Sequence, residues 1–392
     1  MKRLNRFWTL VPLWCLIASA GAADIKLMSQ NQYFGADFRP LIAAENAVEF
    51  NDAIVEVLQT VAASLPAERV KALAAIIEAE QPALVGLQEM YRFQCTDLGM
   101  PVPGTGCSHA SIAGAFTDHL QDTLDALDGG YAAVATMVGL DVPVLPFIIE
   151  GVPALLSATD RDVILARTDI DAVPVDYTAF SGLGICSQPS GDGCNYAFVP
   201  AVVTPFGPVS IDRGYAAVDV TIAGKDYRLV NTHLEVHMVD AGNPLSPVFQ
   251  AAQAMELLQV LLYTTPPNRA LVVLGDFNSS PAYEAMPGPL PLPPPFDDGI
   301  ATPYQQFIAA GFTDAWTLRP GNLDDFTCCQ LGDLSNQQSV LYERVDLVFA
   351  LEAPVGVKKA RVLGANVSDK TPPAGLGVWP SDHGSVSLTL RY

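Results

Sequence analysis

The segment Leu271-Val272-Val273-Leu274-Gly275-Asp276-Phe277-Asn278 joins an apolar run to two polar side chains. Consecutive apolar residues bounded by polar chain predict a short strand that is buried on both faces. Asp276 and Asn278 follow that strand, and their spacing places both on one face of an extended chain. A single Asp or Asn at a strand end is more often a turn former or a helix cap, whereas several such ends indicate a site.

Three other apolar runs along the chain end in the same way. The polar residues that follow them are Asn31, Glu89, Asn231 and His233. Sites in α/β proteins are assembled where strands end at one edge of a sheet. The four strand ends together therefore predict one polar site.

Short apolar runs and helical periods alternate along the chain. The runs are Ile25–Ser29, Ala83–Leu87, Val163–Ala166, Ala216–Ile222, Tyr227–Val230, Ala270–Leu274, Val345–Ala350 and Val386–Leu390. Apolar residues recur with a helical period in Phe50–Ser64, Ala67–Glu80, Phe116–Leu127, Phe249–Tyr263 and Tyr304–Ala310. This alternation predicts an α/β protein whose sheets are covered by helices. The Gly-containing turn between Ala216–Ile222 and Tyr227–Val230 predicts a hairpin, so we expect mixed sheets.

The C-terminal part adds two polar sites next to apolar strands. Asp346 interrupts an apolar run, and Asp382 and His383 come just before the last strand. Because a buried carboxylate needs a partner, we expect Asp346 to pair with His383 and to raise its basicity. The alternative is a histidine in a turn that is satisfied by its neighbour Asp382.

Five motifs in this order resemble the endonuclease/exonuclease/phosphatase superfamily, the deoxyribonuclease-I-like metal-dependent phosphoesterases. They are Leu87-Gln88-Glu89, Asn231-Thr232-His233-Leu234, Gly275-Asp276-Phe277-Asn278-Ser279, Arg344-Val345-Asp346 and Ser381-Asp382-His383. The resemblance runs from about residue 25 to the C-terminus. It implies a four-layer α/β sandwich, in which two mixed central sheets pack face to face with helices outside. The active site would lie at one end of this sandwich.

The resemblance also implies which residues hold the metal and the phosphate. Glu89 would be the principal Mg²⁺ ligand, with Asn31 and Asp382 on the metal side and Mn²⁺ as an alternative ion. Asn231 would bind the substrate phosphate. Mg²⁺ typically binds through one or two carboxylates and keeps several waters.

The catalytic roles follow from the same resemblance. His383, oriented by Asp346, would contact phosphate as general base or electrostatic stabiliser. His233 would protonate the leaving oxygen or hold the phosphate. Asp276 and Asn278 would position the attacking water, and the motifs leave open whether Asp276 or His383 takes its proton. These roles describe a phosphoric ester hydrolase, a phosphodiesterase.

The net charge of the chain bears on the class of substrate. The 392 residues include 21 Lys+Arg and 42 Asp+Glu, for a formal net charge of −21. Proteins that grip extended nucleic acid need clustered basic residues, and here these residues are few and scattered. Extended nucleic-acid binding is therefore unfavourable, and nothing in the sequence implies a partner protein.

The N-terminal residues predict export. Lys2, Arg3 and Arg6 precede the apolar stretch Phe7–Ala18, and small residues follow. This pattern is typical of a signal peptide cleaved near Ala20 or Ala22, because the apolar stretch is short for a membrane anchor. We therefore expect residues 1–22 to be a signal peptide, residues 24–392 to form one domain, and the mature protein to be secreted or periplasmic.

The cysteines agree with an oxidising compartment. Six remain after Cys15 leaves with the signal peptide: Cys95, Cys107, Cys186, Cys194, Cys328 and Cys329. Proximity favours disulfides Cys95–Cys107 and Cys186–Cys194 and leaves Cys328 and Cys329 as an adjacent pair. A metal site is the alternative, but no CxxC or His-rich spacing supports zinc.

The leading hypothesis is a small-molecule or lipid phosphodiester as substrate. Met137–Leu156 is apolar and contains prolines, and as a lid or wall it would meet an acyl chain or make peripheral contact with a membrane. Several exported members of the family that the motifs resemble cleave phospholipids such as sphingomyelin. The alternatives are an extracellular deoxyribonuclease-I-like nuclease and a catalytically silent binding module. Met286–Pro295 is rich in proline and predicts a stiff surface loop.

Overall fold

A computed structural model describes residues 24–100, 102–205, 207–237, 245–288, 290–320, 326–373 and 377–392. The predicted signal peptide, residues 1–22, lies outside the described residues. Within the described part of the chain, no helix combines the length and the apolar character needed to cross a membrane.

Two large mixed sheets form the centre of the protein. The strands of the first sheet, in spatial order, are β18 (Gly356–Leu363), β19 (Ser385–Arg391), β1 (Asp24–Asn31), β2 (Leu84–Gln88), β5 (Val152–Arg167) and β3 (Arg92–Asp97), with β4 (Tyr131–Ile149) also paired to β5. Those of the second are β16 (Thr313–Asp314), β17 (Asp346–Ala350), β13 (Ala270–Asp276), β12 (Lys225–His233), β11 (Gly214–Ile222), β8 (Gly193–Asn195) and β7 (Gln188–Pro189), with β6 (Ala172–Pro174) also paired to β11. Parallel and antiparallel pairs occur in both, so the prediction of mixed sheets is confirmed.

Smaller elements complete the chain. Two short hairpins are formed by β9 (Ala201–Thr204) with β10 (Gly207–Ser210) and by β14 (Met286–Pro287) with β15 (Gly299–Ile300). The 3₁₀ turns are η1 (Gly106–Ser108), η2 (Ala113–Ala115), η3 (Tyr177–Leu183), η4 (Ala315–Leu318) and η5 (Val367–Asp369).

The inner faces of the two sheets share one apolar core. Leu27 of the first sheet and Leu229 and Val272 of the second belong to the same buried cluster. Gly86 of β2 marks a close approach of the two sheets, because a Cβ atom there would lie 2.2 Å from Leu274 Cδ1 and 2.6 Å from Asn231 Oδ1. A glycine thus allows the sheets to meet face to face.

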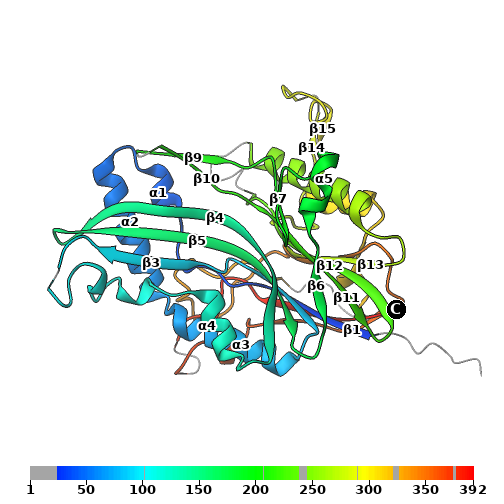
Figure 1. Ribbon diagram of the computed structural model, residues 1–392, viewed down its shortest axis with the longest axis horizontal. Helices are drawn as coiled ribbons and strands as arrows, with labels where there is room; N and C mark the ends of the chain where they lie inside the picture. Colours follow the sequence, from blue (N-terminus) through cyan, green and yellow to red (C-terminus); the bar gives the residue numbers. More distant parts are fainter. Residues whose placement is uncertain are drawn as a thin grey trace, which may run out of the picture.

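Helices cover both outer faces, which gives four layers (Figure 1). On the first sheet lie α3 (Pro66–Glu80) and α4 (His119–Ala126), packed on residues such as Val85 and Leu165. On the second lie α5 (Ser246–Thr264) and α6 (Pro303–Ala309), packed on residues such as Val273 and Phe349. The predicted four-layer α/β sandwich is therefore confirmed.

The apolar segment Met137–Leu156 is not a separate lid. It lies in β4 and β5, a long hairpin that extends from the first sheet (Figure 1). One face of the hairpin packs on α2 (Ala47–Ala63), next to the short α1 (Arg39–Ala43), and buries Phe147 and Leu156. The apolar side chains of this segment lie on both faces of a strand pair. Composition alone does not distinguish such a hairpin from a lid or a wall of the site.

Candidate active site

The strand register brings the predicted polar ends together. Asn31 pairs with Gln88 across β1 and β2, and His233 pairs with Asp276 across β12 and β13. Asp276 also faces Asp346 of β17. The glycine before Asp276 fits this crowded edge, because a Cβ atom at Gly275 would lie 1.9 Å from the Thr232 carbonyl oxygen.

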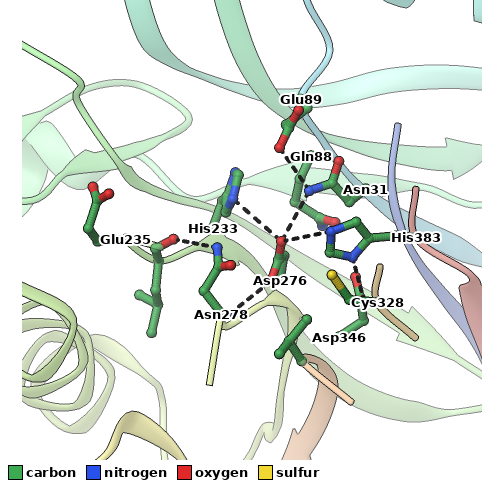
Figure 2. Close-up of polar contacts among 12 residues, drawn as sticks. Asn31, Gln88, Glu89, His233, Glu235, Asp276, Asn278, Cys328, Asp346 and His383 are labelled. Atoms are coloured by element: carbon green, nitrogen blue, oxygen red, sulfur yellow. Dashed lines mark hydrogen bonds and ion pairs between the residues drawn. The ribbon is translucent and has the colours of Figure 1, made fainter. Parts of the chain in front are cut away.

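Asp276 lies at the centre of the cluster (Figure 2). Its Oδ2 atom is 3.1 Å from Asn31 Nδ2, 3.5 Å from His233 Nε2 and 3.7 Å from His383 Nε2. Its Oδ1 atom accepts a hydrogen bond from the backbone N–H of Asn278 at 2.8 Å. One carboxylate oxygen therefore faces two imidazoles and an amide.

Glu89 and Asn31 form one side of the site. Glu89 follows β2 in the left-handed region, with φ 57°, a conformation that non-glycine residues adopt at a cost. Its Oε1 atom accepts a hydrogen bond from Asn31 Nδ2 at 3.1 Å, and its Oε2 atom accepts one from the Phe34 N–H at 3.2 Å. The turn thus directs the carboxylate toward Asn31.

Asp382 supplies a further carboxylate. Burial raises its pKa to about 7, opposed by His383 and reinforced by Glu89 and Asp276. The nearby Arg69 does not pair with these acids, because it donates to the carbonyl oxygens of Ser64, Gln32, Tyr33 and Pro380. Oxygen ligands that repel one another fit a hard divalent cation.

His383 forms the predicted pair with Asp346. Its Nδ1 atom lies 2.8 Å from Asp346 Oδ2, and both side chains are buried. Burial alone would lower the pKa of His383, but Asp346, Asp382 and Asp276 outweigh it and hold that pKa well above its usual value. The raised pKa thus favours the protonated ring, whose Nδ1 donates to Asp346 and whose Nε2 faces Asp276 and Asp382.

The pKa of His233 is shifted in the opposite direction to that of His383. Arg213 Nη1 lies 2.7 Å from His233 Nδ1, and since a guanidinium can only donate, this nitrogen accepts. The proton of the neutral ring is then on Nε2, which faces Asp276. Burial lowers the pKa of His233 well below its usual value, and Arg213 and His383 lower it further. The two histidines thus differ in charge on either side of Asp276.

Around Arg213 lies an acidic group that the sequence analysis missed. Arg213 Nη1 is 3.8 Å from Asp160 Oδ2, Arg213 Nε is 4.0 Å from Glu235 Oε2, and His233 Nδ1 is 3.9 Å from Asp162 Oδ1. Burial raises the pKa of Asp160 to about 7 and that of Asp162 well above its usual value. Asp160 and Asp162 lie within β5, two residues apart and just before the apolar run Val163–Ala166, so the same spacing rule applied before an apolar run would have found them.

The two asparagines contribute differently. Asn231 is fully buried between the sheets; its Nδ2 atom donates to the carbonyl oxygens of Leu87 and Val163, and its Oδ1 atom accepts from Gln88. These contacts occupy the amide expected to bind phosphate. Asn278 is partly exposed, and its Nδ2 atom donates to the Leu234 carbonyl oxygen at 3.0 Å.

Two tyrosines near β2 lie at different distances from the site. Tyr91 lies in the site, where burial and the charges of Asp160 and Glu89 raise its pKa well above the usual value. Tyr131 lies elsewhere, because its hydroxyl donates to the Pro82 carbonyl oxygen at the opposite end of β2.

Residues 59–383 match the model of the Endonuclease/Exonuclease/phosphatase family. The chain belongs to this family. Members of the Endonuclease/Exonuclease/phosphatase family are phosphoesterases, and the matched range contains every predicted site residue except Asn31. No curated protein matches the chain.

Solved structures support the fold of the Endonuclease/Exonuclease/phosphatase family. A family protein from Bacteroides thetaiotaomicron has a TM-score of 0.52 and 14% identity, covering 95% of this chain and 98% of that one. A mannosyl-6-phosphatase from the same organism has a TM-score of 0.50 and 14% identity, covering 93% and 98%. At such identities the likeness shows the fold alone.

Proposed function

We propose that the protein is an exported, Mg²⁺-dependent phosphodiesterase that acts on a small-molecule or lipid phosphodiester. The observation that carries this proposal is the arrangement around Asp276, which lies between a charged and a neutral histidine. Hydrolysis of a phosphodiester needs a group that activates water, a donor for the leaving oxygen and positive charge for the phosphoryl oxygens.

Glu89, Asn31 and Asp382 would hold the Mg²⁺ ion. When bound there, such an ion neutralises phosphoryl charge and polarises the phosphorus–oxygen bonds. Mn²⁺, which also prefers oxygen ligands, is the alternative.

Asp276 would orient the attacking water and take its proton. Asn31 and the Asn278 N–H fix its two oxygens, and His383 is a poor competitor for this role because Asp346 occupies its Nδ1 and its raised pKa favours the protonated ring. We therefore assign the general base to Asp276.

The two histidines would act on opposite sides of the phosphate. His383, held by Asp346, would donate to a phosphoryl oxygen as a cation. His233, with its proton on Nε2, would donate a hydrogen bond to the leaving oxygen, and solvent would supply the proton that this oxygen takes up. Asn231 holds the strand that carries His233, a positioning role in place of the phosphate contact first expected.

The surface around the site supports a compact or lipid-like substrate. A hollow of about 370 Å³ is lined in part by apolar side chains such as Val138 and Val142 and in part by polar ones such as Asp212. It borders the site, because a Cβ atom at Gly139 would lie 3.7 Å from Asp160 Oδ2. Exposed Val144 and Ile148 on the β4–β5 hairpin offer an apolar surface, while the net charge of −21 opposes a polynucleotide.

Hydrolysis of bis(p-nitrophenyl) phosphate by the mature protein tests the proposal. Turnover should require Mg²⁺ or Mn²⁺, stop with EDTA, and fall by about a hundredfold or more in His383→Ala. His109→Ala is the matched control, because His109 lies apart from the site beside Glu150. Equal turnover in His383→Ala and the wild type would reject the site.

A second assay identifies the substrate class. Supercoiled DNA and choline phospholipid vesicles are offered side by side to the protein with Mg²⁺. Release of phosphocholine without nicking of DNA supports a lipid phosphodiester as the substrate. Nicking of DNA alone would establish the nuclease instead.

A further inference from the structure

Cys328 and Cys329 lie beside the catalytic histidine. The structure joins them in a disulfide. Two further disulfides, Cys95–Cys107 and Cys186–Cys194, lie elsewhere in the chain. Ligand atoms of Cys328, Cys329 and His383 all lie within 4.8 Å of one another. Figure 2 shows the Cys328 sulfur close to Asp346 and His383. Two sulfur atoms and an imidazole therefore lie close enough together to bind one metal ion.

The backbone holds this group together independently of the disulfide. The Cys328 N–H donates to the Glu343 carbonyl oxygen at 3.0 Å, and the Cys328 carbonyl oxygen accepts from the Tyr342 N–H at 2.7 Å. On the other side, the Gly384 N–H donates to the Thr327 carbonyl oxygen at 2.7 Å. Opening the disulfide therefore leaves both cysteines beside His383.

The same segment also supports the catalytic pair. The Thr327 hydroxyl oxygen accepts from the N–H groups of Val345 and Asp346, and the Gln330 N–H donates to the Asp382 carbonyl oxygen at 2.8 Å. The cysteines thus lie on a brace between the strand with Asp346 and the loop with His383.

We propose that Cys328, Cys329 and His383 form a redox-gated binding site for a thiophilic divalent cation such as Zn²⁺ or Cd²⁺. A phosphine or dithiol reductant supplies two electrons and is itself oxidised, and the disulfide takes up two protons to become two thiols. The cation then displaces both thiol protons and the proton on the His383 nitrogen that binds it. Thiolates and imidazole are the ligands that soft and borderline cations select.

Occupation of this site blocks catalysis whichever ring nitrogen binds. His383 Nδ1 is used by Asp346, and Nε2 faces Asp276. The disulfide state therefore protects the proposed phosphodiesterase from poisoning by thiophilic cations, and this consequence rests on the proposed function. Cys329 is partly exposed whereas Cys328 is 3% exposed, so a small reductant would attack at Cys329.

Cadmium titration of the folded protein tests the site without using activity. The protein is reduced with a phosphine, freed of reductant without oxygen, and titrated with Cd²⁺ while the thiolate-to-cadmium charge-transfer absorbance is followed. Because the phosphine also opens Cys95–Cys107 and Cys186–Cys194, the variants are made in a Cys95→Ser/Cys107→Ser/Cys186→Ser/Cys194→Ser background. We expect a band in this background when it is reduced, and loss of the band when it is oxidised or when it also carries Cys328→Ser/Cys329→Ser. His383→Ala should keep the thiols and weaken binding by about tenfold or more, because one ligand is lost.

An equal band in Cys328→Ser/Cys329→Ser, or an unchanged affinity in His383→Ala, would overturn the proposal. If circular dichroism shows that reduction unfolds the chain, Cys329→Ser provides the test without reductant. This variant has a free Cys328 thiol, which should bind Cd²⁺ with His383 and lose affinity in Cys329→Ser/His383→Ala. A cadmium band without phosphodiester turnover would support the metal site and count only against the proposed function.

Discussion

At the scale of single residues, Arg213 sets the state of His233. Replacing it with Gln removes the donor that occupies Nδ1 and the positive charge that keeps the ring neutral. The pKa of His233 should rise in Arg213→Gln, so the fall in activity at low pH should move to higher pH. We expect kcat/KM to drop about tenfold to a hundredfold. Arg167→Gln, at the surface pair with Asp169, is the control, and an unshifted pH–rate profile in Arg213→Gln would contradict this role.

Asp346→Asn separates charge from hydrogen bonding at His383. The amide oxygen can still accept from Nδ1, but the loss of a negative charge should lower the pKa of His383. The imidazolium would then be lost at lower pH, so the high-pH limb of activity should move down. We expect about a hundredfold lower kcat at neutral pH. A chemical shift titration of His383 measures the pKa, and an unchanged value would contradict the pairing.

Candidate site residues could be predicted from the sequence where a polar side chain follows an apolar strand, as at Glu89 and Asp276. Asp160 and Asp162 were missed because they lie within β5, before its apolar run, and β5 runs antiparallel to β2. The spacing placed Asn231 on the same face of β12 as His233. Spacing does not, however, show how deeply a side chain is buried. Its amide lies between the sheets, where backbone carbonyls occupy it.

At the scale of elements, the central strands were predictable because both their faces are buried. β18 was not, since its two lysines, Lys358 and Lys359, are exposed at the edge of the sheet and break any apolar run. The β4–β5 hairpin was also missed, because α2 covers one face of it while the other retains apolar side chains.

The exposed face of that hairpin carries a prediction. Val144 and Ile148 are 55% and 53% exposed, so Val144→Glu/Ile148→Glu should fold normally. If lipid is the substrate, this variant should bind choline phospholipid vesicles less and lose about tenfold or more in vesicle hydrolysis, because buried charge is costly. Its activity on bis(p-nitrophenyl) phosphate should be unchanged. Val173→Glu, which changes a residue 56% exposed on β6, is the control, and equal vesicle binding by both variants would contradict the hairpin's role.

At the scale of the whole molecule, protons and metal compete for the same carboxylates. The pKa of Asp382 is raised to about 7 by burial, so below that pH the metal must displace a proton to bind. We expect Mg²⁺ affinity to be about tenfold weaker at pH 6 than at pH 8, and nearly constant above pH 8. The rise in Tm on adding Mg²⁺ should therefore be larger at pH 8 than at pH 6.

Calorimetric titration and thermal melts measure both quantities. Asp382→Asn should remove most of this pH dependence, while Asp226→Asn, a change in the β11–β12 turn, should preserve it. A pH-independent Mg²⁺ affinity in the wild type would exclude Asp382 from the metal side.

The pairing of β1 with β19 has a consequence for the order of synthesis. Asp24 lies opposite Arg391, so the first described strand is completed by the last one. Asn31 ends β1, and His383 lies two residues before β19. The site therefore assembles only after the chain through Arg391 has left the ribosome, because β1 must then wait for β19 to pair with it.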